Sequence, residues 1–237
     1  MKSLYFDIEI SDVFELKPGE DLMKYAPFHI SVAATLDSDG NRRLWHSCDE
    51  HGRPSLNMDQ AKAQELLDHL QARHAEGWAL FSWNGLKFDL RWIGHNAGNM
   101  ELAARIALAH YDPFFQFFNQ RGFVIALEAA AQGLGIRQKK LMEAKDAPRH
   151  WRAGNHQLVM DYVLGDCEIT RQVLESITRE GGLRWVTKQG RVSWEPMKKF
   201  KTVAEVLRDP EPDQSWMTGS PLKRSQFIEW LPGRLPR

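Results

Sequence analysis

The sequence predicts an α/β fold, a mixed β-sheet with helices on both faces. Three strand-like segments come first, over residues 3–10, 29–36 and 43–48, and a helix, a fourth strand and further helices follow them. Antiparallel strands followed by a crossover connection are typical of such a sheet. The chain has 237 residues, 43% of them hydrophobic, which is enough for one large domain with a sizeable core.

The strands are identified by their β-forming residues and by the turns between them. Residues 3–10 alternate in polarity, which is typical of a strand with two different faces. The residues Asp-Ser-Asp-Gly-Asn at 37–41 are a hairpin signal between the second and third strands. Residues 78–83 are an apolar run that ends at Asn84-Gly85, and they predict a buried fourth strand.

The helices are identified by apolar spacing and by their end signals. Asn57 is a candidate cap for a helix that runs to about residue 74, and another helix begins near Phe88. Residues 100–111 are expected to be helical up to Asp112-Pro113, and residues 124–134 up to Gly135. Residues 136–155 look like a basic loop, and a long helix covers residues 156–180.

The composition excludes several classes of protein. Two cysteines cannot make a disulfide scaffold, and they fit a reducing compartment. No run approaches the ~20 apolar residues of a membrane helix. Asp7 and Glu9 lie where a signal peptide would be apolar. We therefore expect a cytoplasmic protein without a membrane partner.

Carboxylates recur at three places along the chain. Asp7 and Glu9 lie two apart on the first strand and therefore share one face, where a divalent cation would offset their burial. Asp89 follows the fourth strand in the string Asn84-Gly85-Leu86-Lys87-Phe88-Asp89. Tyr162 and Asp166 lie four apart on the last long helix. Each motif alone is weak, because solvated acidic residues are common, but their joint order is a strong signal.

The three motifs together resemble the DEDD (DnaQ-like) superfamily of 3′→5′ exonucleases, in its tyrosine branch. The segments 82–89 and 110–112 look most like the exonuclease domain of family B DNA polymerases. The histidine branch places its histidine five residues before the last aspartate, and that position here is Asp161. The resemblance covers roughly residues 3–180 and implies a ribonuclease H-like sheet of five strands.

The resemblance also implies a role for each motif residue. Asp7, Glu9, Asp89 and Asp166 would hold two divalent metal ions, Mg²⁺ or Mn²⁺, with Asp7 bridging them. Glu9 and Asp166 would complete the site of the attacking water, and Asp89 would lie near the ion at the leaving oxygen. Tyr162 would orient the water, because a phenol of pKa ~10 is a poor base at neutral pH.

The implied function is hydrolysis of phosphodiester bonds at 3′ ends, with DNA favoured over RNA and single-stranded DNA favoured as the partner. Asn84 is a candidate nucleic-acid contact. Two alternatives remain open: an exoribonuclease, and a nucleic-acid-binding module of the same fold without catalysis. No polymerase segment is recognised, so a separate polymerase or repair partner is possible.

The domain prediction is an exonuclease domain over residues 1–182 and a basic C-terminal extension over residues 183–237. The extension holds eleven basic and six acidic residues, a net charge of +5, and four tryptophans at 185, 194, 216 and 230. Lys198, Lys199 and Lys201 are therefore candidate phosphate contacts, with the indoles stacking on bases. The alternative is that the tryptophans pack the extension onto the body.

Overall fold

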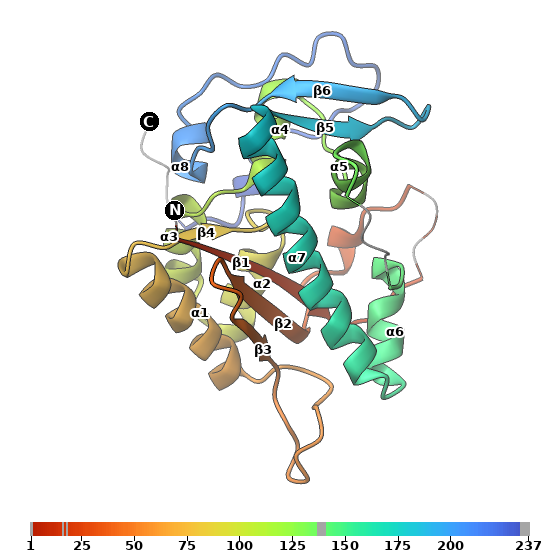
Figure 1. The fold of residues 1–237 in the computed structure, drawn as a ribbon. Coiled ribbons are helices and arrows are strands. Elements are labelled where there is room, and N and C mark those ends of the chain that lie inside the picture. The colour runs from red at the N-terminus through yellow and green to blue at the C-terminus, as the bar shows by residue number, and fades with distance from the viewer. Residues whose placement is uncertain (1, 16, 18, 137–140, 233–237) are drawn as a thin grey trace.

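The computed structural model describes residues 2–15, 17, 19–136 and 141–232. Its main sheet has the strand order β3-β2-β1-β4, with β1 (Ser3–Ile10) at its centre. β2 (Ile30–Asp37) runs antiparallel to β1, and β3 (Arg42–Trp45) runs antiparallel to β2. β4 (Ala79–Phe81) runs parallel to β1. The mixed sheet that the sequence predicts is therefore present (Figure 1).

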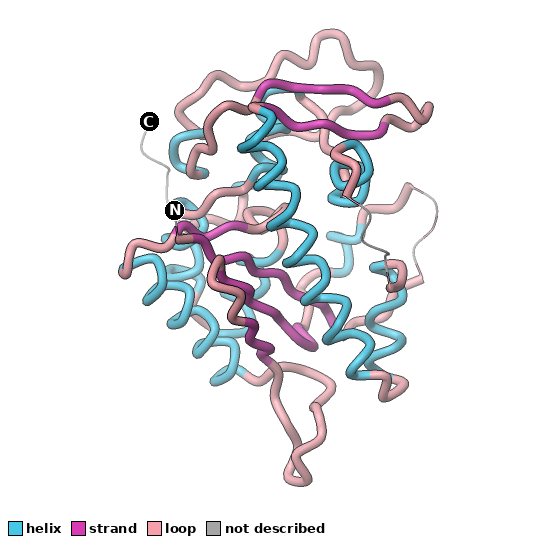
Figure 2. Tube along the Cα trace, in the orientation of Figure 1, coloured by secondary structure: helices cyan, strands magenta, loops and turns pink. Residues whose placement is uncertain are grey.

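The two faces of β1 pack against different layers of helices. Leu4, Phe6 and Ile8 enter one hydrophobic cluster with α1 (Gln60–Ala75), α2 (Asp89–Ala97) and α3 (Met100–Ala109). Tyr5 enters a second cluster with α6 (Ala147–Arg152) and α7 (His156–Glu180). In Figure 2 the strands lie between these helical layers. Because side chains alternate along a strand, Asp7 and Glu9 share the α7 side with Tyr5.

Several helix boundaries differ from those the sequence predicts, for reasons of capping. Asp59, not Asn57, caps α1 by accepting a hydrogen bond from the amide of Lys62. Asp112-Pro113 ends α3 as expected, and it also begins α4 (Pro113–Arg121), with Asp112 as N-cap. The segment 136–155 contains η2 (Ala144–Asp146) and α6, while its residues 137–140 lie outside the described part. Further short elements are η1 (Leu22–Tyr25) and α5 (Leu127–Gly133).

The prediction of a five-stranded sheet differs from the structure, in which the described residues form four strands in the main sheet. Tyr111 occupies the place beside β4, where it makes one parallel bridge to Phe81 and one antiparallel bridge to Thr202. Asp112 and Pro113 follow at once and begin α4, so the extended backbone is too short for a fifth strand.

The C-terminal extension packs onto the rest of the chain. β5 (Gly182–Val186) and β6 (Val192–Pro196) form a hairpin, whose Leu183 and Trp185 join a third cluster with α5 and α7. α8 (Val203–Val206) and α9 (Ser225–Ile228) pack into the cluster around α1 to α3. Among the described residues, no helix combines the length and apolarity that crossing a membrane requires.

Candidate metal centre

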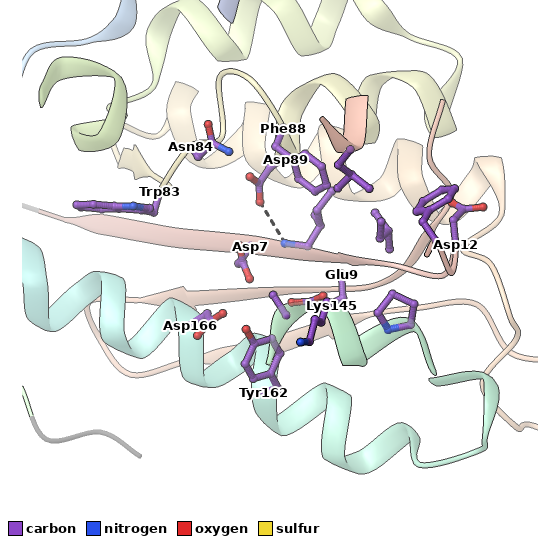
Figure 3. A pocket seen from close by; sticks show the side chains of 16 residues that line it. Asp7, Glu9, Asp12, Trp83, Asn84, Phe88, Asp89, Lys145, Tyr162 and Asp166 are labelled. Atoms are coloured by element: carbon purple, nitrogen blue, oxygen red, sulfur yellow. Dashed lines mark hydrogen bonds between the residues drawn. The ribbon is translucent and has the colours of Figure 1, made fainter. Parts of the chain in front are cut away.

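Three carboxylates from two elements meet between β1 and α7. Asp7 and Glu9 project from β1, and Asp166 projects from α7, four residues after Tyr162 (Figure 3). One oxygen atom of each carboxylate lies within 4.8 Å of the others. The structure thus brings together the first and third sequence motifs, which are about 155 residues apart.

The donor set fits a hard divalent cation. Oxygens bound to one Mg²⁺ at 2.0–2.1 Å lie at most about 4.2 Å apart, so spacings within 4.8 Å close by small side-chain rotations. Burial raises the pKa of Asp7 well above its usual value, and the negative charges of Asp89, Asp166 and Glu9 raise it further. A cation at this place would replace that repulsion with attraction, because it favours the ionised carboxylates.

Asp89 completes the acidic group from the other side of β1. It is the first residue of α2 and is 2% exposed, and its Oδ1 accepts a hydrogen bond of 3.1 Å from the backbone N–H of Ile8. Burial raises the pKa of Asp89 to about 7, with a further contribution from the charge of Asp112. β4 ends opposite Tyr5, so the Ile8 amide is left for Asp89 rather than for a neighbouring strand.

The turn before Asp89 is fixed by Asp112, a residue whose role sequence reasoning missed. Its Oδ1 accepts from the amides of Asn84 (3.1 Å) and Phe115 (3.2 Å), and its Oδ2 accepts from that of Leu86 (3.0 Å). One buried carboxylate therefore caps α4 and also holds the turn. Its signal in the sequence is the Asp-Pro pair, which is as typical of a helix start as of a stop.

Asn84 and Gly85 are suited to this turn in different ways. Asn84 has φ = +74°, a left-handed conformation that asparagine tolerates better than most residues. Gly85 is needed for space, since a Cβ there would lie 1.9 Å from the Oγ of Ser82. The side-chain oxygens of Ser82 and Asn84 and the Nε2 of His110 are buried without a hydrogen-bond partner.

Tyr162 lies against the acidic group and is 4% exposed. Burial raises the pKa of its hydroxyl above the usual value of 10, and the charge of Asp166 raises it further. The phenol is therefore held protonated, which suits a hydrogen-bond donor or a positioning group and not a base.

A cleft of about 320 Å³ opens over these residues. It is lined by all five motif residues and by Asn84, and its apolar wall includes Phe14, Leu22 and Phe88. Lys145 of η2 also lines it, a residue that no sequence motif indicated (Figure 3). A second cavity of about 290 Å³ lies beside α5 and shares Tyr162 and Asp166 with the first. The acidic group is thus reached from two sides.

The candidate phosphate contacts in the extension lie elsewhere. Lys198 lines a different cavity, together with Ser3 and Phe200, near the beginning of β1. The Nζ of Lys201 is 2.6 Å from the carboxylate of Asp209. The backbone carbonyl of Lys199 accepts a hydrogen bond from the side chain of Gln116. None of these three lysines lines either of the two cavities described at the acidic group.

The tryptophans of the extension divide into two pairs. Trp185 is buried in the third cluster, and Trp230 is partly buried with its indole N–H bonded to the protein. Trp194 and Trp216 are 48% and 59% exposed. Packing therefore accounts for two of the four.

Comparison with known proteins supports the fold. No protein-family model matches the chain, and no curated protein matches it. Among solved structures, the chain is similar to the family B DNA polymerase from the hyperthermophilic archaeon Pyrobaculum calidifontis, with a TM-score of 0.52 and 16% identity. The match covers 74% of this chain and 24% of the polymerase chain, so the chain spans about a quarter of the polymerase's length. At this identity the likeness concerns the fold alone.

Proposed function

We propose that this chain is a metal-dependent 3′→5′ exonuclease of the tyrosine branch of the DEDD superfamily, acting on 3′ ends of single-stranded DNA. The observation that carries the proposal is the convergence of Asp7, Glu9 and Asp166 within 4.8 Å, beside Tyr162. A polymerase neighbour with the same fold supports it.

The carboxylates fit the two divalent ions that phosphodiester hydrolysis uses. Asp7, Glu9 and Asp166 would hold one ion, and Asp7 and Asp89 would hold the second. Such a pair of Mg²⁺ or Mn²⁺ ions activates water and stabilises the leaving oxygen. Asp89 comes from the start of α2, and its carboxylate interacts directly with that of Asp7, so the two side chains could share a second ion.

The remaining residues of the cleft bind the nucleic acid and orient the attacking water. The hydroxyl of Tyr162 stays protonated and would orient the attacking water. Phe14 and Phe88 form an apolar wall that fits the face of a nucleobase. Lys145 supplies a positive charge that attracts the phosphate backbone.

The test is degradation of 3′-labelled and 5′-labelled single- and double-stranded DNA and RNA, with Mg²⁺, Mn²⁺ or EDTA. The proposal expects mononucleotide release from the 3′ end of single-stranded DNA with either metal, and none in EDTA. Faster release from RNA would identify an exoribonuclease. Binding without release would identify a non-catalytic module, and degradation undiminished in EDTA would exclude the two-metal chemistry.

A further inference from the structure

The C-terminal segment 225–231 contacts the turn that carries Asn84 and leads to Asp89. The indole Nε1 of Trp230 donates a hydrogen bond of 2.8 Å to the carbonyl of Leu86. We call residues 225–231 the C-terminal strap. The strap lies far along the chain from the site motifs, and the resemblance to exonucleases does not cover it.

Side chains from two distant segments hold the backbone of Leu86. Its N–H donates to the Oδ2 of Asp112, and its carbonyl accepts from Trp230. Leu86 is fully buried, so water cannot take the place of either partner while the turn keeps its position. The turn is therefore fastened at one residue from two directions.

The strap is itself anchored on the helix that Asp112 caps. Phe227 is fully buried, and its ring centroid lies 5.1 Å from that of Phe115 and 4.6 Å from that of Phe118, both on α4. Both groups that hold the turn are therefore connected to α4: Asp112 caps this helix, and the strap packs against it. This arrangement fixes the position of the turn relative to α4.

Two further contacts tie the strap to the residues around the start of α2. Glu229 forms an ion pair of 3.1 Å with Arg91. The Nζ of Lys87 lies 5.7 Å from the ring centroid of Phe227. Both partners are within two residues of Asp89, so the strap contacts the chain on each side of Asp89.

We propose that the C-terminal strap positions the candidate site, and that Trp230 is a positioning residue that acts through the Leu86 carbonyl on Asn84 and Asp89. The consequence for catalysis rests on the proposed function. The consequence for the turn does not, because it follows from the hydrogen bonds alone.

Removal of the indole N–H of Trp230 should displace the carboxylate of Asp89. The Leu86 carbonyl would be buried without its donor, and the turn would shift to reach another partner or water. Asp89 is three residues away and holds the Ile8 amide at 3.1 Å. A displacement of about 1 Å at such a group reduces catalysis by up to about 10²-fold.

The test compares Trp230→Phe with Trp45→Phe. The first variant keeps an aromatic ring but removes the N–H together with part of the indole ring. The control removes an indole bond of 3.2 Å from Trp45 to Thr35, and neither of these residues lines the cleft. Both variants lose one buried hydrogen bond, so an effect on general stability appears in both.

The first readout is amide hydrogen exchange without substrate, followed at Leu86 and Ile8 by NMR. Exchange at these two amides should accelerate at least fivefold in Trp230→Phe and less than twofold in Trp45→Phe. Equal exchange rates in the wild type and in Trp230→Phe would overturn the proposal that the strap positions the turn. This readout holds even if the wild type degrades no nucleic acid, so the two proposals fail separately.

The second readout is kinetic. In Trp230→Phe, kcat should fall about tenfold while KM changes less than threefold, and Mn²⁺ binding at the Asp7 triad should stay within twofold. The control should keep wild-type kinetics. If the wild type is active and Trp230→Phe has the same kcat, the proposal that the strap positions the site is also overturned. If Trp230→Phe fails to fold while Trp45→Phe folds, Trp230→His, which keeps an N–H donor, should restore both readouts, and its failure to do so would count against the strap.

Discussion

Asp7 is the central residue of the acidic group. Its carboxylate interacts with Asp89 and also with Glu9 and Asp166. Its raised pKa reflects this crowding of negative charge in a buried place. Local rules predicted two pairs of these residues, because alternation on a strand puts Asp7 and Glu9 on one face and i, i+4 spacing does the same for Tyr162 and Asp166 on a helix. Asp89 was indicated by the family resemblance.

Replacement of Asp7 by alanine should nearly abolish the nuclease activity and leave single-strand binding intact, because one side chain serves both ions. The measurement is single-turnover release of the 3′ nucleotide in Mg²⁺, with binding followed by fluorescence anisotropy. Asp161→Ala is the matched control, because Asp161 is an exposed acidic residue next to Tyr162 that bonds only Gln157 in the described part. Full activity in Asp7→Ala would contradict the assignment.

His110 should make the fold sensitive to acid. Its ring is fully buried, with Nδ1 2.7 Å from the carbonyl of Ala107, and burial lowers its pKa to about 4. The unfolded chain takes up this proton near pH 6.5 and the folded chain only near pH 4. Stability is therefore lost as the pH falls between these values, by up to about 3 kcal/mol.

The measurement for His110 is the free energy of unfolding in urea at pH 7.5 and pH 5. Its decrease on acidification should be smaller in His110→Gln than in the wild type. Asp112, whose raised pKa of about 6 acts in the opposite direction, is present in both proteins and drops out of the comparison. Equal decreases would show that the histidine is protonated in the folded chain.

At the scale of elements, the turn 84–86 shows what local patterns leave out. The sequence located the turn, because Asn-Gly follows an apolar strand. Its restraint by Asp112 and Trp230 is set by tertiary contacts over 26 and 144 residues, which no local spacing encodes. The missing fifth strand has the same origin, because Asp112 serves α4 and the turn instead of extending the sheet.

Asp112→Ser separates these two tasks of Asp112. Serine is also a good N-cap and can keep the bond to Phe115, but its shorter side chain cannot also reach Asn84 and Leu86. We expect a stability loss of about 1–3 kcal/mol and a decrease of kcat/KM of about 10–100-fold.

Asp59→Ser is the control for this change, because Asp59 caps α1 away from the cleft. Chemical denaturation and steady-state kinetics measure the two effects. A variant that loses stability but keeps kcat/KM would show that the turn does not need Asp112 for its geometry.

At the scale of the whole molecule, the basic extension is the part for which sequence reasoning said least. Net charge and tryptophan count could not say which indoles are buried, because the partners of Trp185 and Trp230 come from distant segments. The prediction that Lys198, Lys199 and Lys201 contact phosphates stands as a prediction. Their neutralisation to glutamine should reduce the slope of log K against log salt by about two to three.

The control for the lysine variant is a triple lysine-to-arginine variant, which keeps the charge. Binding of single-stranded DNA is measured between 50 and 200 mM salt. An unchanged slope in the glutamine variant, with the fold intact, would leave the extension as a structural element only.

Thr202 pairs with Tyr111 beside the main sheet, and Phe227 lies among the phenylalanines of α4. A boundary at residue 182 would therefore cut through shared cores and not through a linker. The consequence is cooperativity: the body and the extension should melt in one transition, because neither buries its apolar surface without the other. Tryptophan fluorescence and far-ultraviolet circular dichroism should give coincident denaturation curves, and two separated midpoints would reveal independent folding units.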